Sequence, residues 1–170
     1  YLFKKNKVTF FHGTGSFVQQ ENGVYEIAVA GKTNESLQAK HIVVATGSSA
    51  RALPQAQFGE HMILSNDGAL KMGSVPARLG VIGAGVIGLE MGSVWRRLGA
   101  DVTVLEGAST FLSAVDEQIA KEAQKLFTKQ GLNMQFGVKI GEIKKTAKTI
   151  TVHYQDAAGA EHALVCDKLI

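Results

Sequence analysis

The spacing of hydrophobic and polar positions divides the chain into two parts. In the first part, short hydrophobic runs at residues 8–12, 16–20 and 24–29 are separated by glycine and polar residues, a pattern typical of β-strands. Asn22-Gly23, between the last two runs, is a strong signal for a tight hairpin turn. Gly13-Thr14-Gly15 predicts a bend. We therefore expect this part to be rich in β-structure and to contain little helix.

Residues 41–45 form a continuous apolar and β-branched run, which is typical of a parallel strand that is buried on both faces. Thr46-Gly47-Ser48 follows directly and indicates a loop at the end of that strand. Ser65 has the side chain of a helix N-cap and precedes a short helical turn. Residues 73–76 have the composition of a linker, so we predict a domain boundary between residues 75 and 76.

From residue 77 onward, strand and helix patterns alternate. The strand patterns lie at residues 79–82, 101–105 and 132–136, and the helix patterns lie at residues 86–98 and 117–130. Asp116 is a candidate N-cap, and Gly99 and Gly131 mark the ends of the two helices. This βαβαβ order predicts an α/β fold with an open parallel sheet. Further strand patterns at residues 139–145, 149–154 and 163–165 predict a β-meander after it.

Composition excludes several classes of protein. Among 170 residues, 45% are hydrophobic, 19% are charged and only 2 are proline, which argues against a disordered chain. The net charge of +3 comes from dispersed basic residues, so we expect no nucleic-acid partner. No apolar run approaches the ~18 residues of a membrane span, so we expect a soluble protein without a membrane partner. A single cysteine suits a reducing compartment, and we expect a cytoplasmic location.

The strongest chemical signal is the glycine pattern that lies between the predicted strand at residues 79–82 and the helix that follows it. In a dinucleotide-binding fold, Gly83 would form the tight turn, Gly85 would let the backbone approach a pyrophosphate, and Gly88 would let the helix pack close to the strand. The unpaired N–H groups and the dipole at the helix N-terminus favour a negatively charged group. The pattern alone is weak, because other glycine-rich turns between strand and helix can produce it.

Glu106 strengthens the prediction of a dinucleotide site. It lies at the carboxyl end of the next strand pattern, where such a fold places an acid. A carboxylate there accepts hydrogen bonds from the 2′- and 3′-hydroxyls of the adenosine ribose and repels a 2′-phosphate. We therefore expect NAD rather than NADP. The alternative for Glu106 is an exposed acid at a strand end that contacts no ligand.

These motifs resemble dihydrolipoyl dehydrogenase, the flavin-containing E3 component of 2-oxo acid dehydrogenase complexes, among the flavin disulfide reductases. The glycine motif, Glu90, Glu106 and the segment Ala45-Thr46-Gly47-Ser48 occur in the order found in that family. Further matching segments lie at residues 95–100, 102–106, 115–121 and 129–132. The resemblance covers essentially the whole chain.

The resemblance implies a Rossmann-like NAD-binding domain at residues 76–170, preceded by a β-rich distal part of an FAD-binding domain at residues 1–75. It places Glu90 near the nicotinamide, Glu106 on the adenosine ribose and Ile140 against the adenine. The residues implied in NAD binding are Gly83, Ala84, Gly85, Val86, Ile87, Gly88, Leu89, Glu90, Glu106 and Ile140. Those implied in FAD binding are Gly15, Thr46, Gly47 and Ser48.

The chain also departs from the family pattern. The redox pair of two cysteines has no match, and we expect the lone Cys166 to be structural. The first FAD glycine motif and the His-Glu acid/base pair have no match either, and the five histidines lack metal-ligand spacing. We therefore expect a fragment that binds NAD but carries no catalytic residue and no metal site. The resemblance implies a homodimeric parent that oxidises dihydrolipoamide on lipoyl domains, with FAD as relay and NAD as acceptor.

Two other classes of function are open alternatives. The chain could be the NAD-binding domain of another flavin disulfide reductase, such as a mercuric or glutathione reductase, although Glu106 counts against the members that use NADP. It could instead be a non-catalytic module that senses nucleotides, or a scaffold whose glycine turn binds nothing. Nucleotide titrations and the effect of NAD on the melting temperature distinguish these alternatives.

Overall fold

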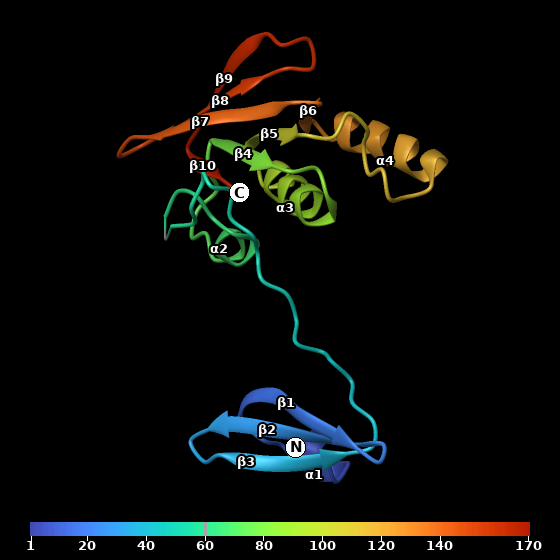
Figure 1. Cartoon of the computed structure of the whole chain (residues 1–170). Coiled ribbons are helices and arrows are strands. Elements are labelled where there is room, and N and C mark those ends of the chain that lie inside the picture. Colours follow the sequence, from blue (N-terminus) through green and yellow to red (C-terminus); the bar gives the residue numbers. More distant parts are fainter. Residues whose placement is uncertain (60) are drawn as a thin grey trace. The chain divides into compact units, whose positions relative to one another are not determined.

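Tyr1–Ser48 and Ser49–Ile170 are separate units of the computed structural model, which describes residues 1–59 and 61–170 (Figure 1). The first unit contains helix α1 (Leu2–Lys5) and an antiparallel sheet of three strands in the order β1-β2-β3. These strands are β1 (Gly13–Glu21), β2 (Val24–Gly31) and β3 (Glu35–Ala39). The predicted hairpin is confirmed, because Asn22 and Gly23 have φ angles of 50° and 77°, the positive pair that a type I′ turn requires.

Two expectations for the first unit are wrong. Residues 8–12 form no strand, and residues 13–15 begin strand β1 instead of forming a bend. Gly13 lies opposite Gly31 in the β1–β2 ladder, and a Cβ atom on Gly13 would lie 2.5 Å from the carbonyl oxygen of Ala30. Glycine therefore serves close pairing of the two backbones at this position.

The expectation of a buried parallel strand at residues 41–45 is also wrong. The segment contains no strand, and Val43 and Val44 are 88% and 68% exposed. A buried strand takes its hydrogen bonds from neighbours on both sides. No strand among the described residues pairs with this segment, so its apolar side chains stay in solvent.

The second unit contains the predicted parallel sheet. Its strand order is β10-β4-β5-β6, and helix α3 (Val86–Arg97) connects β4 to β5 while helix α4 (Glu117–Lys129) connects β5 to β6. The strands are β4 (Arg78–Ile82), β5 (Asp101–Glu106), β6 (Asn133–Phe136) and β10 (Lys168–Leu169). The βαβαβ order and the mixed α/β class are therefore confirmed.

Local signals explain where α4 starts and why both helices end close to the predicted residues. The Asp116 carboxylate accepts hydrogen bonds from the backbone N–H groups of Gln118 and Ile119 at 3.0 and 3.2 Å. Beyond the helix ends, Gly99 and Gly131 have φ angles of 111° and 91°, which L-residues with a side chain rarely adopt. Each helix ends one residue earlier than the pattern predicts.

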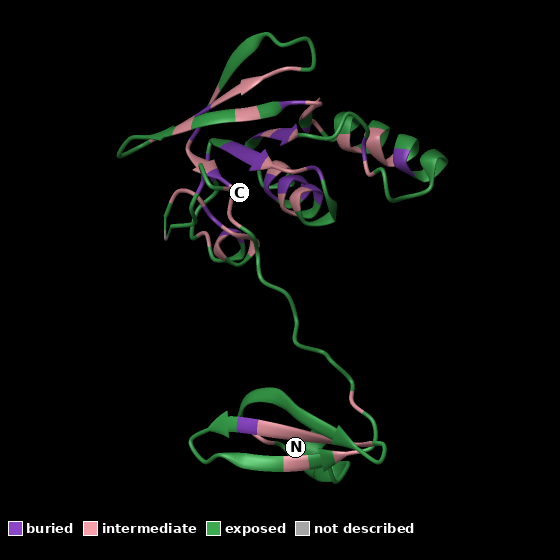
Figure 2. Ribbon diagram, in the orientation of Figure 1, coloured by how far each residue is buried: buried purple, intermediate pink, exposed green. Residues whose placement is uncertain are grey.

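The parallel sheet lies between helix α3 and a β-meander of three antiparallel strands, in the order β7-β8-β9 (Figure 1). The meander strands are β7 (Lys139–Lys145), β8 (Ile150–Gln155) and β9 (Glu161–Cys166). Alternate residues of β5 face the two sides: Val102 and Val104 pack in the core that contains Leu89 of α3, and Leu105 packs in the core that contains Val152 of β8. Figure 2 shows the buried residues concentrated in these layers.

Residues 49–75 pack with the parallel sheet. Helix α2 (Asn66–Leu70) is capped by Ser65, whose hydroxyl accepts a hydrogen bond from the backbone N–H of Gly68 at 3.3 Å. The backbone N–H of Leu64 donates to the carbonyl of Leu169 in β10 at 2.8 Å, and the N–H of Leu169 donates to Met62 at 2.9 Å. The compact units therefore divide after residue 48. The boundary at residues 75 and 76 concerns the two cofactor domains and stays a prediction.

Candidate functional site

The glycine turn between β4 and α3 places three glycines under three different constraints. Gly83 has a φ of 105° and donates its backbone N–H to the carbonyl of Leu105 at 2.8 Å, which fixes the turn against β5. A Cβ atom on Gly88 would lie 2.0 Å from the carbonyl oxygen of Gly83, so helix and turn touch there. A Cβ atom on Gly85 would meet no atom within 4 Å, and the backbone is open to an approaching group. These constraints match the three glycine roles of a dinucleotide-binding turn.

The first turn of α3 is an open helix N-terminus. Gly85 occupies the N-cap position and has no side chain with which to accept a hydrogen bond. Val86 and Ile87, the first two helical residues, are 65% and 52% exposed, so protein atoms leave this end of the helix accessible. The backbone N–H groups of a first turn lack partners inside the helix and carry the positive end of its dipole. This helix end can therefore hold an anion.

Glu106 is fixed beside the turn by two hydrogen bonds to backbone N–H groups. Its Oε2 accepts from Ala84 at 2.6 Å, and its Oε1 accepts from Ala108 at 2.7 Å. Because Ile82 of β4 pairs with Leu105 of β5, the strand that carries Glu106 ends next to the glycine turn. An ionised carboxylate has about four acceptor positions, so both oxygens keep lone pairs for hydroxyl groups. The structure thus brings together the two parts of the predicted dinucleotide site.

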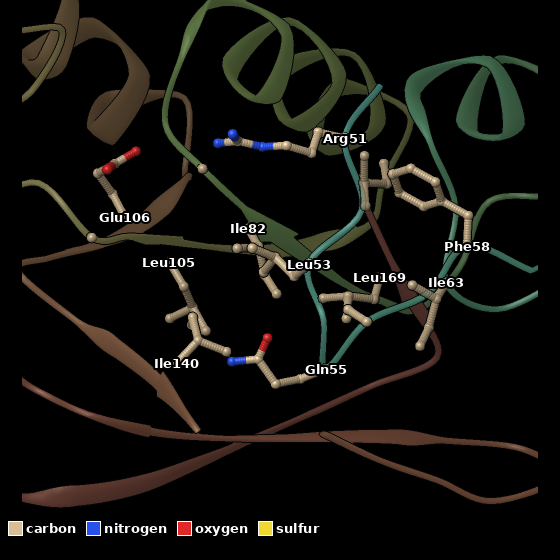
Figure 3. Close-up of a pocket in the computed structure, with 14 residues that line it drawn as sticks. Arg51, Leu53, Gln55, Phe58, Ile63, Ile82, Leu105, Glu106, Ile140 and Leu169 are labelled. Atoms are coloured by element: carbon tan, nitrogen blue, oxygen red, sulfur yellow. The ribbon is translucent and has the colours of Figure 1, made fainter. Parts of the chain in front are cut away.

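A pocket of about 510 Å³ opens beside this turn (Figure 3). Gly83 and Glu106 lie on its wall, together with Ile140 of strand β7. The remaining apolar lining comes from the parallel sheet and from the segment before α2, and includes Leu53, Phe58, Ile63, Ile82, Leu105 and Leu169. The pocket has the size of a small-molecule site and combines an apolar surface with a few polar groups. The structure therefore brings Ile140 to the predicted site.

The other residues of the glycine segment differ in accessibility. Ala84 and Leu89 are 3% and 2% exposed, so their side chains pack in the core and do not face a ligand. Glu90 is exposed on α3 and does not line the pocket described above. Its predicted place near the nicotinamide stays a prediction.

The residues expected to contact FAD lie in the first unit. Gly15 is in strand β1, opposite Val29 of β2. Thr46, Gly47 and Ser48 lie in an exposed segment without regular structure, where Gly47 has a φ of 75°. No strand pairing joins Gly15 to this segment in the part of the chain that the structure describes. Contact of these residues with FAD stays a prediction.

Cys166 has the surroundings of a structural residue. Its side chain is fully buried in the core between the parallel sheet and the meander. Burial raises the pKa of the thiol to about 11, because the charged thiolate is poorly solvated there. A thiol with this pKa is protonated at neutral pH and is a poor nucleophile. Cys166 therefore has neither the access nor the ionisation of a redox cysteine.

Within residues 1–59 and 61–170, no three His, Cys, Asp or Glu side chains group together in a way that could hold a metal ion. No helix in the same ranges combines the length and hydrophobicity that a membrane crossing requires.

Sequence analysis missed the contribution of the segment before α2 to the pocket. Arg51, Leu53, Gln55 and Phe58 all line it, although the sequence predicts only a loop there. Their approach to the glycine turn is a long-range contact, and no local pattern of residues signals it.

The family model described as pyridine nucleotide-disulphide oxidoreductase matches residues 1–170. The chain is 51% identical over 170 residues to dihydrolipoyl dehydrogenase of Cupriavidus necator, a match that covers 100% of this chain and 35% of that protein. It is 40% identical over 166 residues to the mitochondrial dihydrolipoyl dehydrogenase of Pisum sativum, covering 96% and 32%. The chain thus spans about a third of the length of these relatives.

A solved structure shares the fold. LpdA of Mycobacterium tuberculosis superposes with a TM-score of 0.74 over 93% of this chain and 34% of that chain. The sequence identity between the two is 22%, so this likeness concerns the fold alone.

Proposed function

Because this chain belongs to the pyridine nucleotide-disulphide oxidoreductase family, we propose that it binds NAD at the turn between β4 and α3. The observation that carries the proposal is the carboxylate of Glu106, which is hydrogen-bonded to the backbone of Ala84 at the glycine turn. An acid in this place, next to an open helix N-terminus, supplies both the ribose contact and the anion site of a dinucleotide.

Each part of the site has a role in the proposed complex. The first-turn N–H groups of α3 would hold the pyrophosphate, where Gly85 leaves the backbone open. Glu106 would accept hydrogen bonds from the ribose hydroxyls, and Ile140 would contact the adenine. Bound NAD supplies a hydride acceptor. The role of this chain would be to bind and orient it.

Specificity for NAD over NADP follows from the charge of Glu106. A 2′-phosphate in the position of the ribose hydroxyls would lie against the carboxylate, and like charges at such a distance cost several kcal/mol. We infer that the site prefers NAD.

The intact protein would use this site in a longer reaction. We propose that the parent is a homodimeric dihydrolipoyl dehydrogenase in the cytoplasm, which oxidises dihydrolipoamide on lipoyl domains with FAD as relay and NAD as acceptor. Residues 76–170 would form its NAD-binding domain, and residues 1–75 would belong to its FAD-binding domain through Gly15, Thr46, Gly47 and Ser48. Support comes from the 51% identity over the whole chain to a protein of that name.

A titration of the chain with NADH and NADPH tests the proposal. We expect NADH to bind more tightly than NADPH by about tenfold or more. In Glu106→Gln, one backbone N–H loses its acceptor and the ribose loses a charged partner, so NADH affinity should fall roughly tenfold and the preference over NADPH should narrow. Glu122→Gln, on the exposed surface of α4, removes the same charge and serves as the matched control.

The outcomes also separate the alternatives. Tighter binding of NADPH would favour a reductase of the glutathione reductase kind. No binding and no change in melting temperature with either nucleotide would identify the glycine turn as a purely structural element. We expect no tight FAD binding by this chain alone, and a stoichiometric flavin absorbance band in the purified chain would contradict that expectation.

A further inference from the structure

Arg51 contributes to the same pocket as the glycine turn, although it lies far away in the sequence. Its side chain is on the pocket wall with Gly83 and Glu106, and Figure 3 shows it extending toward the side of the pocket where Glu106 lies. Arg51 belongs to the segment that precedes α2, outside the βαβ unit that carries the dinucleotide motif. No part of the glycine pattern assigns it a role.

The backbone around Arg51 is held in place by contacts of the residues that follow it. The backbone N–H of Ala56 donates to the carbonyl of Leu53 at 3.0 Å, and the side-chain amide of Gln57 donates to the same carbonyl at 3.1 Å. Ala56 is 5% exposed and anchors this turn in the unit. Arg51 therefore reaches the pocket from a position two residues before a hydrogen-bonded turn.

The charges around the pocket favour a diphosphate only if a cation is also present. A diphosphate carries about two negative charges, and a helix N-terminus supplies an equivalent of about half a positive charge. Glu106 adds a negative charge in the same pocket, which opposes the binding of any anion. Among the described residues that line this pocket, Arg51 is the one cationic side chain. Without it, the pocket would be net negative where the proposed ligand is negative too.

We propose that Arg51 binds the diphosphate of the dinucleotide, opposite the N-terminus of α3. This inference rests on the proposed NAD site and adds a residue from another part of the fold to it. The guanidinium group is planar, always charged and able to donate two parallel hydrogen bonds to phosphate oxygens. Arg51 and the helix end then hold the diphosphate from two sides, while Glu106 holds the ribose. The cation also offsets the repulsion between Glu106 and the phosphates.

Calorimetric titration of the full chain with NADH and with ADP-ribose tests this role. ADP-ribose retains the diphosphate but lacks the nicotinamide. We expect Arg51→Gln to weaken both ligands by roughly tenfold to a hundredfold, the range of a lost hydrogen bond to a charged group. Arg51→Lys should recover part of the affinity, because it keeps the charge but loses the paired hydrogen bonds. The difference in affinity between Arg51→Gln and the wild type should be smaller at high salt, because salt screens the charge of Arg51.

Arg97→Gln is the matched control. It removes an equal charge from the exposed C-terminal end of α3, at the opposite end of the helix from the glycine turn. We expect it to bind both ligands like the wild type, and all variants to keep the wild-type melting temperature.

The results distinguish this inference from the proposed function. If wild type binds NADH and Arg51→Gln binds it equally well, the role of Arg51 is refuted and the NAD site stands. An equal loss in Arg97→Gln would also refute it, because the effect would then come from net charge alone. If wild type binds neither ligand, both proposals fail.

Discussion

Gly83, Gly85 and Gly88 show how one amino acid serves three purposes at residue scale. Gly83 needs a positive φ, Gly88 needs the absence of a side chain against a carbonyl oxygen, and Gly85 meets no protein atom at all. The first two requirements come from the fold. Because no protein atom lies close to Gly85, the proposed diphosphate would have room to approach the backbone at the third position.

We therefore expect alanine to destabilise the fold at Gly88 but not at Gly85. Gly88→Ala places a methyl group 2.0 Å from the carbonyl oxygen of Gly83, so helix or turn must shift. The free energy of unfolding should fall by about 1–3 kcal/mol or more, the cost of an overpacked site. NADH binding should be lost with it. Thermal unfolding by circular dichroism and an NADH titration measure the two effects.

Gly85→Ala is the matched comparison. Gly85 has φ and ψ angles of −73° and 177°, which alanine adopts without strain, and the added methyl group meets open space. The melting temperature should change little, while NADH affinity should fall because the methyl group occupies the place where the phosphate approaches. Unchanged NADH binding by this variant would show that no ligand comes close to Gly85.

Residue patterns predict the site only as far as it is local in sequence, and Ile140 was predicted from the family resemblance instead. The glycine turn and Glu106 lie within one strand, helix and strand, and their spacing alone brought them together. Arg51 reaches the same pocket from a loop whose position depends on packing of Ala56 against the unit. No short-range pattern encodes such a contact.

At the scale of elements, the first residue of β4 is hydrogen-bonded to the segment between β9 and β10. This residue, Arg78, donates a side-chain hydrogen bond to Asp167 at 2.7 Å and a backbone hydrogen bond to the same carboxylate at 2.8 Å. The backbone N–H of Asp167 in turn donates to the carbonyl of Arg78 at 2.9 Å. These hydrogen bonds join the start of β4 to the link between β9 and β10. Strand β4 in turn leads into the glycine turn.

The pair predicts a specific acid sensitivity. The hydrogen bond from the Arg78 guanidinium holds the pKa of the Asp167 carboxyl below its usual value of 3.8. The stability that this carboxylate contributes is therefore present above pH 3.8 and is lost as the pH falls through the lower pKa of the folded state. In Asp167→Asn, stability should be lower at neutral pH and should decrease less steeply on acidification. Urea unfolding at several acidic pH values measures this slope.

Glu122→Gln is the control for this prediction, since Glu122 is an exposed residue of helix α4. The free energy of unfolding of this variant should decrease with falling pH as steeply as that of the wild type. Equal slopes for all three proteins would mean that the ion pair contributes nothing to folding, as is common for pairs at the surface.

Elements with a complete local signal were predicted well, and elements that depend on distant partners were not. Both long helices carry caps and helical spacing within their own sequence, and they end within one residue of the prediction. Residues 41–45 have the composition of a buried strand, but a strand also needs a partner for its hydrogen bonds. Strand β10 has only two residues, and its pairing with β4 cannot be inferred from them.

At the scale of the whole molecule, the proposed site belongs to one of the two units. The glycine turn, Glu106, Ile140 and Arg51 all lie in Ser49–Ile170. Leu64 and Ala69, from the segment before β4, are 4% and 0% exposed and belong to the buried residues of this unit. The segment at residues 49–75 is therefore structurally part of the unit that would bind NAD, even if it belongs to another cofactor domain in the parent.

A truncation series tests this division. Residues 49–170 alone should fold, with an NADH affinity within about twofold of the full chain, because an independent unit keeps its own core. Residues 76–170 should be less stable by on the order of 2–4 kcal/mol, since they lose buried apolar side chains and the hydrogen bonds to β10. They should also bind NADH more weakly, because the pocket loses the wall that contains Arg51. Thermal unfolding and NADH titration of the full chain, residues 49–170 and residues 76–170 measure these differences. Equal stability and affinity for the two shorter lengths would mean that the boundary at residues 75 and 76 governs folding as well as cofactor binding.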